Sequence, residues 1–461
     1  MRNLKQALLA ALLMPVFISC ATYRQRIDDY YRNLQSGNYL AATKQLDKNR
    51  ILKHTRNRVL YFLEKGYTLH LMKQYDSSNS YLNAADKLME AGNNGAADMA
   101  VSIGLSPMLA RYKPEDYERF MVHYYKALNY LYLSNIEDAL VEARRISLSG
   151  RSVADQHSVI TKKYTNDAFA LILQGVIYEK DADINNAFIS YRNAADIFLK
   201  HESKDYYGVT MPEQLKKDVL RTAYLMGFRS DLEFYERKFN MKFNPSSVTN
   251  TKELVLFTEV GMAPAKREMN TMFTLFKDGE GFFFSDYTNR YRIPVDYSIG
   301  IKKEDISLDK MKTFRIALPS YSTFRSSTTS VQATILKDSS SFIFEKVEDL
   351  NVLATSLLQE RMLKEVGTAL SRMLLRKLAE KEASKKDKAL GEVLEALSFA
   401  AEQADTRNWQ SLPSNIYYAR IPLTGNTDSL SIRLDGHNSR TVQLAVSSTQ
   451  QLQVYNVRDM N

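Results

Sequence analysis

The chain has 461 residues, of which 44% are hydrophobic and 25% are charged, and its formal net charge is +9. This length predicts two or three domains, and the composition is that of a globular protein with a sizeable core. With 17 Gly and 10 Pro the chain is neither collagen-like nor broadly disordered. The single Cys excludes a disulfide framework, a Cys-rich zinc site and an iron–sulfur cluster, and the 6 His show no ligand spacing. We therefore expect no metal and no cofactor.

The first twenty residues have the pattern of an export signal. Two basic residues precede an apolar run, 7–18, which is shorter than the roughly 20 residues that span a membrane. The run ends in Phe17-Ile18-Ser19-Cys20, which resembles the lipobox of bacterial lipoproteins. That resemblance implies a signal peptide over 1–19 and acylation of Cys20, for example by palmitate, and two or three acyl chains anchor a protein stably. An ordinary secreted protein and a buried core cysteine are the alternatives.

The residues after the cysteine bear on location. Ala21 stands where an inner-membrane retention signal has Asp, and no acidic run follows it. We therefore expect a lipid anchor in the cell outer membrane, facing the periplasm, with the choice of membrane and leaflet left open. Export also excludes nucleic acid as the partner of this basic chain. Anionic headgroups, cell-wall polymer or an acidic protein partner are the candidates, and general solubility is the alternative.

Residues 20–245 carry apolar residues at helical spacing. The clearest unit, 166–201, has Gly175 on its first helix and Tyr191 on its second, in a large–small–large pattern that resembles a tetratricopeptide (TPR) repeat. Further copies cover 62–85 and 127–146, with a half-unit from Gly37 and an irregular period. The sequence thus predicts an all-α, TPR-like array in which Gly or Ala admits a large side chain of the paired helix. Such arrays present a concave surface to a peptide or protein partner.

Three residues of this array are candidate partner contacts. Arg144 and Arg145 form a basic pair that suits a carboxylate, and Tyr178 lies on the first helix of the clearest unit. A solvated face for the arginines and a core position for the tyrosine are the alternatives.

The polar stretch 244–250 predicts a domain boundary, and 251–461 is expected to form an α+β domain. Strand patterns occur on both sides of a two-helix hairpin at about 347–404, so we expect that hairpin to pack on an antiparallel or mixed sheet. A basic cluster over 372–388 suits either lipid headgroups or the end of a helix.

Six segments carry a wider resemblance: Ala139–Arg145, Asp167–Phe169, Asn186–Phe188, Leu254–Pro264, Thr313–Pro319 and Glu402–Pro413. They resemble a poorly characterised family of TPR-containing bacterial envelope lipoproteins, over nearly the whole mature chain. The family has no established activity, and the resemblance implies a role in peptidoglycan or envelope maintenance.

No catalytic motif is present: the chain lacks a nucleophile elbow, a Walker loop and an HExxH motif. Two charged segments are nevertheless unusual, 259–268 and 405–409. If they meet, Glu259, Lys266, Asp405 and Arg407 form a charged pocket under Trp409, the only tryptophan. An Asp–Arg ion pair that orders a loop, with the tryptophan as a core residue, is the alternative.

Three hypotheses follow. The first is a non-catalytic scaffold that binds a periplasmic or membrane protein through the array. The second is a binding module that grips a cell-wall or lipid ligand through the C-terminal domain, and the third is a wall-active enzyme. The repeat array favours the first.

Overall fold

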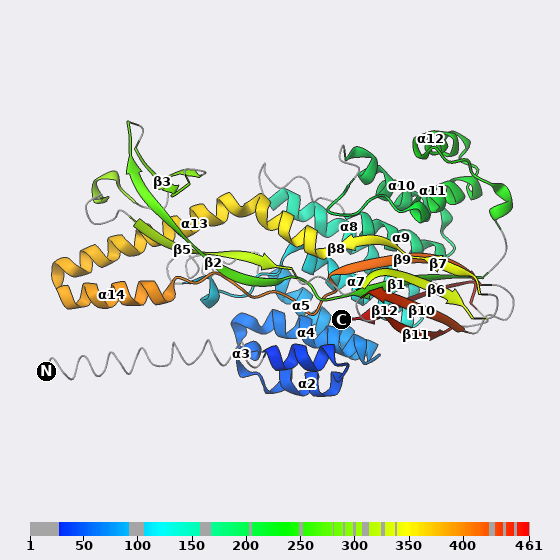
Figure 1. Ribbon diagram of the computed structural model, residues 1–461, viewed down its shortest axis with the longest axis horizontal. Coiled ribbons are helices and arrows are strands. Elements are labelled where there is room, and N and C mark those ends of the chain that lie inside the picture. The colour runs from blue at the N-terminus through cyan, green and yellow to red at the C-terminus, as the bar shows by residue number, and fades with distance from the viewer. Residues whose placement is uncertain are drawn as a thin grey trace.

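The computed structural model describes residues 27–460 except for 92–105, 157–166, 202–204, 249–251, 280, 289–290, 298–300, 307–312, 324–327, 337–338, 424–428, 437–438 and 447–449 (Figure 1). The expected signal peptide, 1–19, and Cys20 lie outside these residues. Among the helices that are described, none combines the length and the apolar composition needed to cross a bilayer.

The N-terminal half is built from helical hairpins in series. The described hairpins pair the segment 27–35 with α2 (Tyr39–Lys48), α4 (Arg58–Leu71) with α5 (Tyr75–Ala91), α7 (Asp116–Tyr132) with α8 (Ile136–Gln156), α9 (Ala168–Lys180) with α10 (Ile184–Lys200), and α11 (Glu213–Leu225) with α12 (Arg229–Phe239). The short helix α3 (Arg50–Lys53) connects α2 to α4.

Every one of these hairpins turns in the same way. The first helix ends in one residue of left-handed conformation, with φ between 59° and 74°: Gly37, Lys73, Ser134, Ala182 and Gly227. The N–H of the following residue then donates to the carbonyl five positions back, at 2.8 to 3.0 Å. This is the Schellman motif, which satisfies carbonyls that the end of a helix leaves unpaired. The repeat is therefore structural even where its sequence spacing varies.

Glycines set the distance between paired helices. A Cβ on Gly66 of α4 would lie 2.8 Å from the side chain of Leu82 on α5, and one on Gly175 of α9 would lie closer still to the ring of Tyr191 on α10. The predicted role of these small residues, to admit a large side chain of the paired helix, is confirmed.

The described C-terminal strands form three four-stranded sheets. We call the sheet with strand order β12-β1-β9-β8 the central sheet, β11-β10-β6-β7 the outer sheet and β4-β3-β2-β5 the arm sheet. The strands are β1 (Lys252–Val260), β2 (Ala265–Lys277), β3 (Phe282–Asp286), β4 (Arg292–Pro294), β5 (Thr313–Ser322), β6 (Thr328–Ile335), β7 (Ser341–Ile343), β8 (Glu345–Asp349), β9 (Asn415–Leu423), β10 (Ser429–Gly436), β11 (Arg440–Ala445) and β12 (Leu452–Asp459). Only the β1–β12 pairing is parallel among these ladders.

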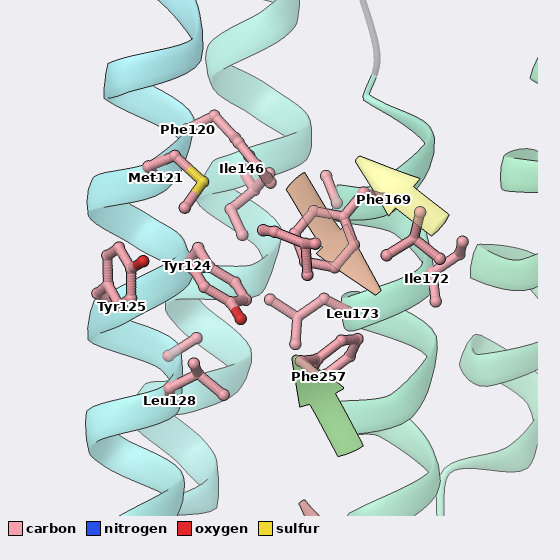
Figure 2. Packing of buried hydrophobic residues seen from close by; sticks show 14 of the residues in the cluster. Phe120, Met121, Tyr124, Tyr125, Leu128, Ile146, Phe169, Ile172, Leu173 and Phe257 are labelled. Atoms are coloured by element: carbon pink, nitrogen blue, oxygen red, sulfur yellow. The ribbon is translucent and has the colours of Figure 1, made fainter. Parts of the chain in front are cut away.

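Both faces of the central sheet are covered. On β1, Val255 and Phe257 point into the core of the helical array, whereas Leu254 and Leu256 point into the core shared with the outer sheet. This partition follows from the alternation of side chains along a strand. Figure 2 shows Phe257 beside Tyr124 of α7 and Phe169 of α9; the Phe169 and Phe257 ring centroids are 5.5 Å apart. The array and the sheet therefore share one apolar core.

The helices α13 (Leu350–Lys386) and α14 (Lys388–Ala401) occupy the stretch for which a hairpin is expected. They project from the body as an arm, and the arm sheet packs on α13 (Figure 1). Within the basic cluster, Arg372 and Arg376 are buried against the carboxylate of Glu402. These two charges therefore stabilise the base of the arm.

The structure departs from the sequence prediction in the number of sheets, because it has three four-stranded sheets where one sheet is expected. The charged segment after Pro264 is strand β2, and its side chains Lys266 and Glu268 bond to other parts of the chain. The helices α11 and α12, for which the sequence shows no clear repeat unit, form a further hairpin with the common turn.

Candidate functional site

The surface that a repeat array offers to a partner is occupied here by the chain's own central sheet. The first helix of each hairpin from α4 onward (α4, α7, α9 and α11) contacts the central sheet or the segment that leads into it. These contacts are both apolar and polar, and they bury charged groups.

Glu259, near the end of β1, lies fully buried among tyrosines of the array. The hydroxyls of Tyr124 and Tyr125 on α7 donate to its two carboxylate oxygens at 3.0 and 2.9 Å. Asn456 Nδ2 on β12 donates to the same carboxylate at 2.7 Å. Burial and the nearby Glu259 carboxylate hold the pKa of both tyrosines well above its usual value, so both remain donors.

Arg458, two residues further along β12, compensates this charge. Its Nε donates to the Tyr67 hydroxyl of α4 at 2.6 Å, and its Nη1 donates to the Glu259 carbonyl oxygen at 3.2 Å. Its Nη2 donates to the Ser411 carbonyl oxygen at 3.2 Å. One guanidinium thereby joins a first helix, the central sheet and the segment that precedes β9.

His70 completes this cluster in its neutral form. Its Nδ1 lies 2.6 Å from Asn129 Oδ1, and its Nε2 lies 3.2 Å from Asn456 Nδ2, an obligate donor. Nε2 is therefore the acceptor and Nδ1 carries the proton. Burial lowers the pKa of the imidazole, in agreement with this tautomer.

A second buried cluster lies at the other end of the sheet. Arg420 of β9 is surrounded by the carboxylates of Glu179, Asp218 and Glu253, and the Tyr418 hydroxyl donates to Asp218 at 2.6 Å. Arg221 of α11 pairs with the same Glu179 and Asp218. Burial opposes ionisation of Glu179, but the two guanidinium groups outweigh it and lower its pKa.

The sheet also caps a helix of the array. Glu345 of β8 accepts the backbone N–H groups of Glu213 at 2.7 Å and of Gln214 at 2.8 Å. These are orphan donors of the α11 N-terminus, where a carboxylate is favoured by the helix dipole. The array and the central sheet are therefore mutually dependent.

The segment 402–414, which we call the clasp, leads from α14 to β9 between the two halves. Arg407 in the clasp is 2% exposed. Its guanidinium forms a bidentate pair with Asp405 at 2.7 and 2.8 Å and donates to Asn57 Oδ1 at 2.7 Å. It also donates to the carbonyl oxygens of Ala110 and Pro107, each at 3.1 Å. A buried irregular segment needs such partners, because its backbone has no ladder of its own.

Two carboxyl groups of the array accept hydrogen bonds from the clasp. The Trp409 N–H donates to Glu118 Oε1 at 2.6 Å, and the Ser411 hydroxyl bonds Glu64. Burial raises the pKa of Glu64 from 4.5 to about 7. Burial and the neighbouring Glu115 raise that of Glu118 to about 7 as well. Both acids are held mainly by hydroxyl and N–H donors.

Glu115 behaves in the opposite way. Its carboxylate pairs with Lys266 of β2 and with Arg361 of α13. Burial opposes its ionisation, but these two cations outweigh burial and hold its pKa well below the usual range. Glu115 thus joins the array to the arm as a charged group.

The two segments singled out in the sequence do meet. Asn408 accepts the Lys266 N–H at 3.2 Å and donates to the Pro264 carbonyl oxygen at 3.0 Å. Their charges, however, point in different directions: Glu259 faces α7, Lys266 pairs with Glu115, and Asp405 pairs with Arg407. Trp409 is fully buried, and its ring packs against the rings of Tyr67 and Tyr125, at centroid distances of 6.2 and 6.1 Å.

The three array candidates lie on the other side of the helices. Arg144 is exposed on α8, and its Nε donates to the Tyr178 hydroxyl at 2.9 Å. Arg145 pairs with Asp86 at 2.7 Å and with Glu90 at 2.6 Å. Tyr178 is 7% exposed. Arg144 is therefore the most accessible of the three.

Sequence reasoning missed Glu64, Glu118, Arg420, Asn456 and Arg458. A signal was available for Glu64, a single acid within the apolar run of α4. No local pattern identifies the others, because their partners lie far away in the chain. Across the described residues, no group of three or more His, Cys, Asp or Glu side chains is arranged to hold a metal ion.

Comparison with known proteins identifies helical-repeat structures. No family model matches the chain, and no curated protein matches it significantly. The chain is similar to MamA residues 41-end from Desulfovibrio magneticus RS-1, with 15% identity, 47% of this chain and 90% of that chain covered, and a TM-score of 0.29. It is also similar to a Podosopora anserina putative kinesin light chain with TPR-like repeats, with 11% identity, 47% and 92% covered, and a TM-score of 0.31. It is similar as well to BtubC from P. vanneervenii, with 13% identity, 50% of this chain and 80% of that chain covered, and a TM-score of 0.30. Likenesses this distant support no functional inference.

Proposed function

We propose that this chain is a lipid-anchored cell-envelope scaffold. It is held in the outer membrane by acylated Cys20, faces the periplasm, and binds a periplasmic or membrane protein without catalysing a reaction. The lipobox-like end of the signal and the resemblance to envelope lipoproteins support the location. The same resemblance favours a role in peptidoglycan or envelope maintenance.

The single observation that carries the scaffold proposal is the occupied inner face. The first helices of the hairpins pack against the central sheet through an apolar core and through buried charge clusters. The array and the sheet therefore form one body. A partner of the array then binds the second helices. There Val141 of α8 is 47% exposed and Leu199 of α10 is 40% exposed, and Arg144 lies one turn from Val141.

Site-specific photo-crosslinking in cells tests this surface. A photoreactive residue replaces Val141 in one variant and Leu199 in another. The control replaces Ile343, which is 71% exposed on β7. We expect the same protein to be captured at both helical sites and not at Ile343. Capture at Ile343 alone would move the partner surface to the outer sheet and contradict the proposal.

The anchor is tested separately. Mass spectrometry of the purified mature protein is expected to show an acylated N-terminal Cys20, and Cys20→Ser is expected to release the chain into the soluble fraction. An unmodified Cys20 would refute the anchor and leave the crosslinking result intact. Turnover of purified peptidoglycan by the purified protein would refute the non-catalytic assignment.

The ligand-binding alternative meets an obstacle in the fold. Trp409 is fully buried and Arg407 is bonded to Asp405, to Asn57 and to backbone carbonyls. A cell-wall or lipid ligand reaches these groups only if the clasp leaves the array. The scaffold proposal requires no such opening.

A further inference from the structure

We propose that the first hairpin of the array is a membrane-docking surface, and that a basic strip on α2 and α3 binds the anionic headgroups of the bilayer that holds the anchor. The strip consists of Leu40, Lys44, Lys48, Arg50 and Lys53. This inference rests on the proposed acylation of Cys20, and it adds which face of the molecule meets the membrane.

The part of the strip on α2 lies on one face of that helix, and Arg50 and Lys53 are exposed on α3. Leu40, Lys44 and Lys48 are spaced four residues apart on α2 and are exposed, whereas Ala42 and Leu46 on the opposite face are buried. Residues at this spacing are neighbours on a helix surface. Leu40 is 56% exposed, an apolar side chain among cations. Figure 1 shows α2 at the edge of the molecule, on the side of the array away from α11 and α12.

The positive charge of this strip is not neutralised by the protein. Asp47 is the only acidic residue between Tyr39 and Arg58. Its carboxylate is already engaged by Lys65 Nζ of α4 at 2.8 Å and by the Tyr61 hydroxyl at 2.8 Å. Among the described residues, no ion pair involves any of the four cations of the strip.

The described residues just before α2 add little to the net charge around the strip. The helical segment 27–35 contributes an exposed Asp28 and an ion pair between Asp29 and Arg32. The strip therefore remains the uncompensated positive surface of the first hairpin.

Chain length fixes where this surface lies relative to the anchor. The first described helical residue, Ile27, follows Cys20 by seven positions, and an extended chain spans about 3.5 Å per residue. A lipidated Cys20 therefore keeps Ile27, where the first hairpin begins, within about 25 Å of the bilayer surface. Attraction between lysine or arginine and an anionic leaflet acts over about a Debye length, roughly 8 to 10 Å. Only a surface close to the anchor benefits from it reliably.

The other basic region of the chain is a weaker candidate. Along 372–388, Arg372 and Arg376 are buried with Glu402, Lys377 pairs with Glu380, and Lys385 pairs with Glu382. The exposed lysines at the turn between α13 and α14 nevertheless make a matched control, since they are equally accessible.

The test uses the chain from Ala21 onward, which keeps every described residue and cannot be acylated on Cys20. Binding is measured by co-sedimentation with vesicles of 30% phosphatidylglycerol in phosphatidylcholine and with pure phosphatidylcholine vesicles, at low salt. One variant carries Lys44→Gln, Lys48→Gln and Lys53→Gln. The control carries Lys385→Gln, Lys386→Gln and Lys388→Gln. Fluorescence of buried Trp409 verifies that each variant is folded.

We expect the unsubstituted chain to bind the anionic vesicles and to be released by salt. Each well-placed charge contributes roughly fivefold in partitioning, so the strip variant is expected to bind about 100-fold more weakly. The control is expected to bind as the unsubstituted chain does. Equal binding by the strip variant, loss of binding in the control instead, or no preference for anionic vesicles would each overturn the inference. An unmodified Cys20 in cells would refute the anchor without affecting this assay.

Discussion

Glu64 offers a direct test of how the array holds the clasp. The acid is fully buried and accepts hydrogen bonds from Tyr30 at 2.8 Å and Tyr31 at 2.9 Å and a further one from Ser411. Burial raises its pKa from 4.5 to about 7. The folded state therefore favours the protonated acid, and this contribution to stability is complete below about pH 4.5 and is lost as pH rises through about 7. At 1.36 kcal/mol per pKa unit, the loss amounts to about 3 kcal/mol.

Glu64→Gln removes this titration, since the amide remains neutral at every pH and matches the protonated acid in shape. The free energy of unfolding of the variant minus that of the unsubstituted chain is therefore expected to increase by about 3 kcal/mol between pH 4.5 and pH 8. Urea denaturation followed by the fluorescence of Trp409 measures both free energies, because this single tryptophan is buried within the clasp. Glu137→Gln, at an exposed position of α8, is the control for replacing a carboxylate by an amide. A difference for Glu64→Gln that is independent of pH would refute the reasoning, because it would mean that the native acid is already ionised.

Three further experiments, two of them with a matched substitution elsewhere, probe other parts of the structure. Gly175→Ala places a methyl group against the Tyr191 ring and is expected to destabilise the folded protein by about 1–3 kcal/mol. Gly367→Ala, where an added Cβ meets nothing within 4 Å, is expected to stabilise α13 by about 0.5–1 kcal/mol. Equal melting temperatures of the two variants would contradict this account. Arg420→Met leaves Glu179 and Asp218 buried with one cation fewer, and chemical denaturation is expected to show a loss of about 3–5 kcal/mol, against little change for exposed Arg433→Met. Arg407→Ala is expected to accelerate amide hydrogen exchange in the clasp while α9 and α10 remain protected; a uniform acceleration would show that Arg407 supports the whole fold instead.

The parts of the fold that follow local rules were predictable. Gly175 opposite Tyr191 follows from the packing of paired helices, and the alternation along β1 predicts a strand. Within that strand, Leu254 to Phe257 is continuously apolar, which is typical of a strand buried on both faces. Gly227, at the position that Gly37 occupies in the first hairpin, likewise marked the additional hairpin of α11 and α12.

The interface clusters were not predictable, for a physical reason. The groups that satisfy Glu259 come from α7 and β12, and the groups that satisfy Arg407 come from residues 57, 107 and 110. Glu259 looks isolated in its own segment, and Arg407 has only Asp405 as a partner there, so the tertiary fold supplies the other partners. For the same reason the sequence predicts an open array surface: nothing within 20–245 reveals that β1, β9 and β12 will cover it.

The parallel pairing of β1 with β12 has a consequence for biosynthesis. Val260 pairs with Asp459, so the central sheet acquires strand β12, with Asn456 and Arg458, only after residues 452–459 have been made. About 200 residues separate the two strands, which at 5–20 residues per second corresponds to about 10 to 40 seconds of translation. Throughout that interval the apolar faces of α7 and α9 lack the complete central sheet that covers them in the folded protein. Deletion of β12 is therefore expected to expose part of the interior of the N-terminal half, because Asn456 and Arg458 bond Glu259 and Tyr67 there.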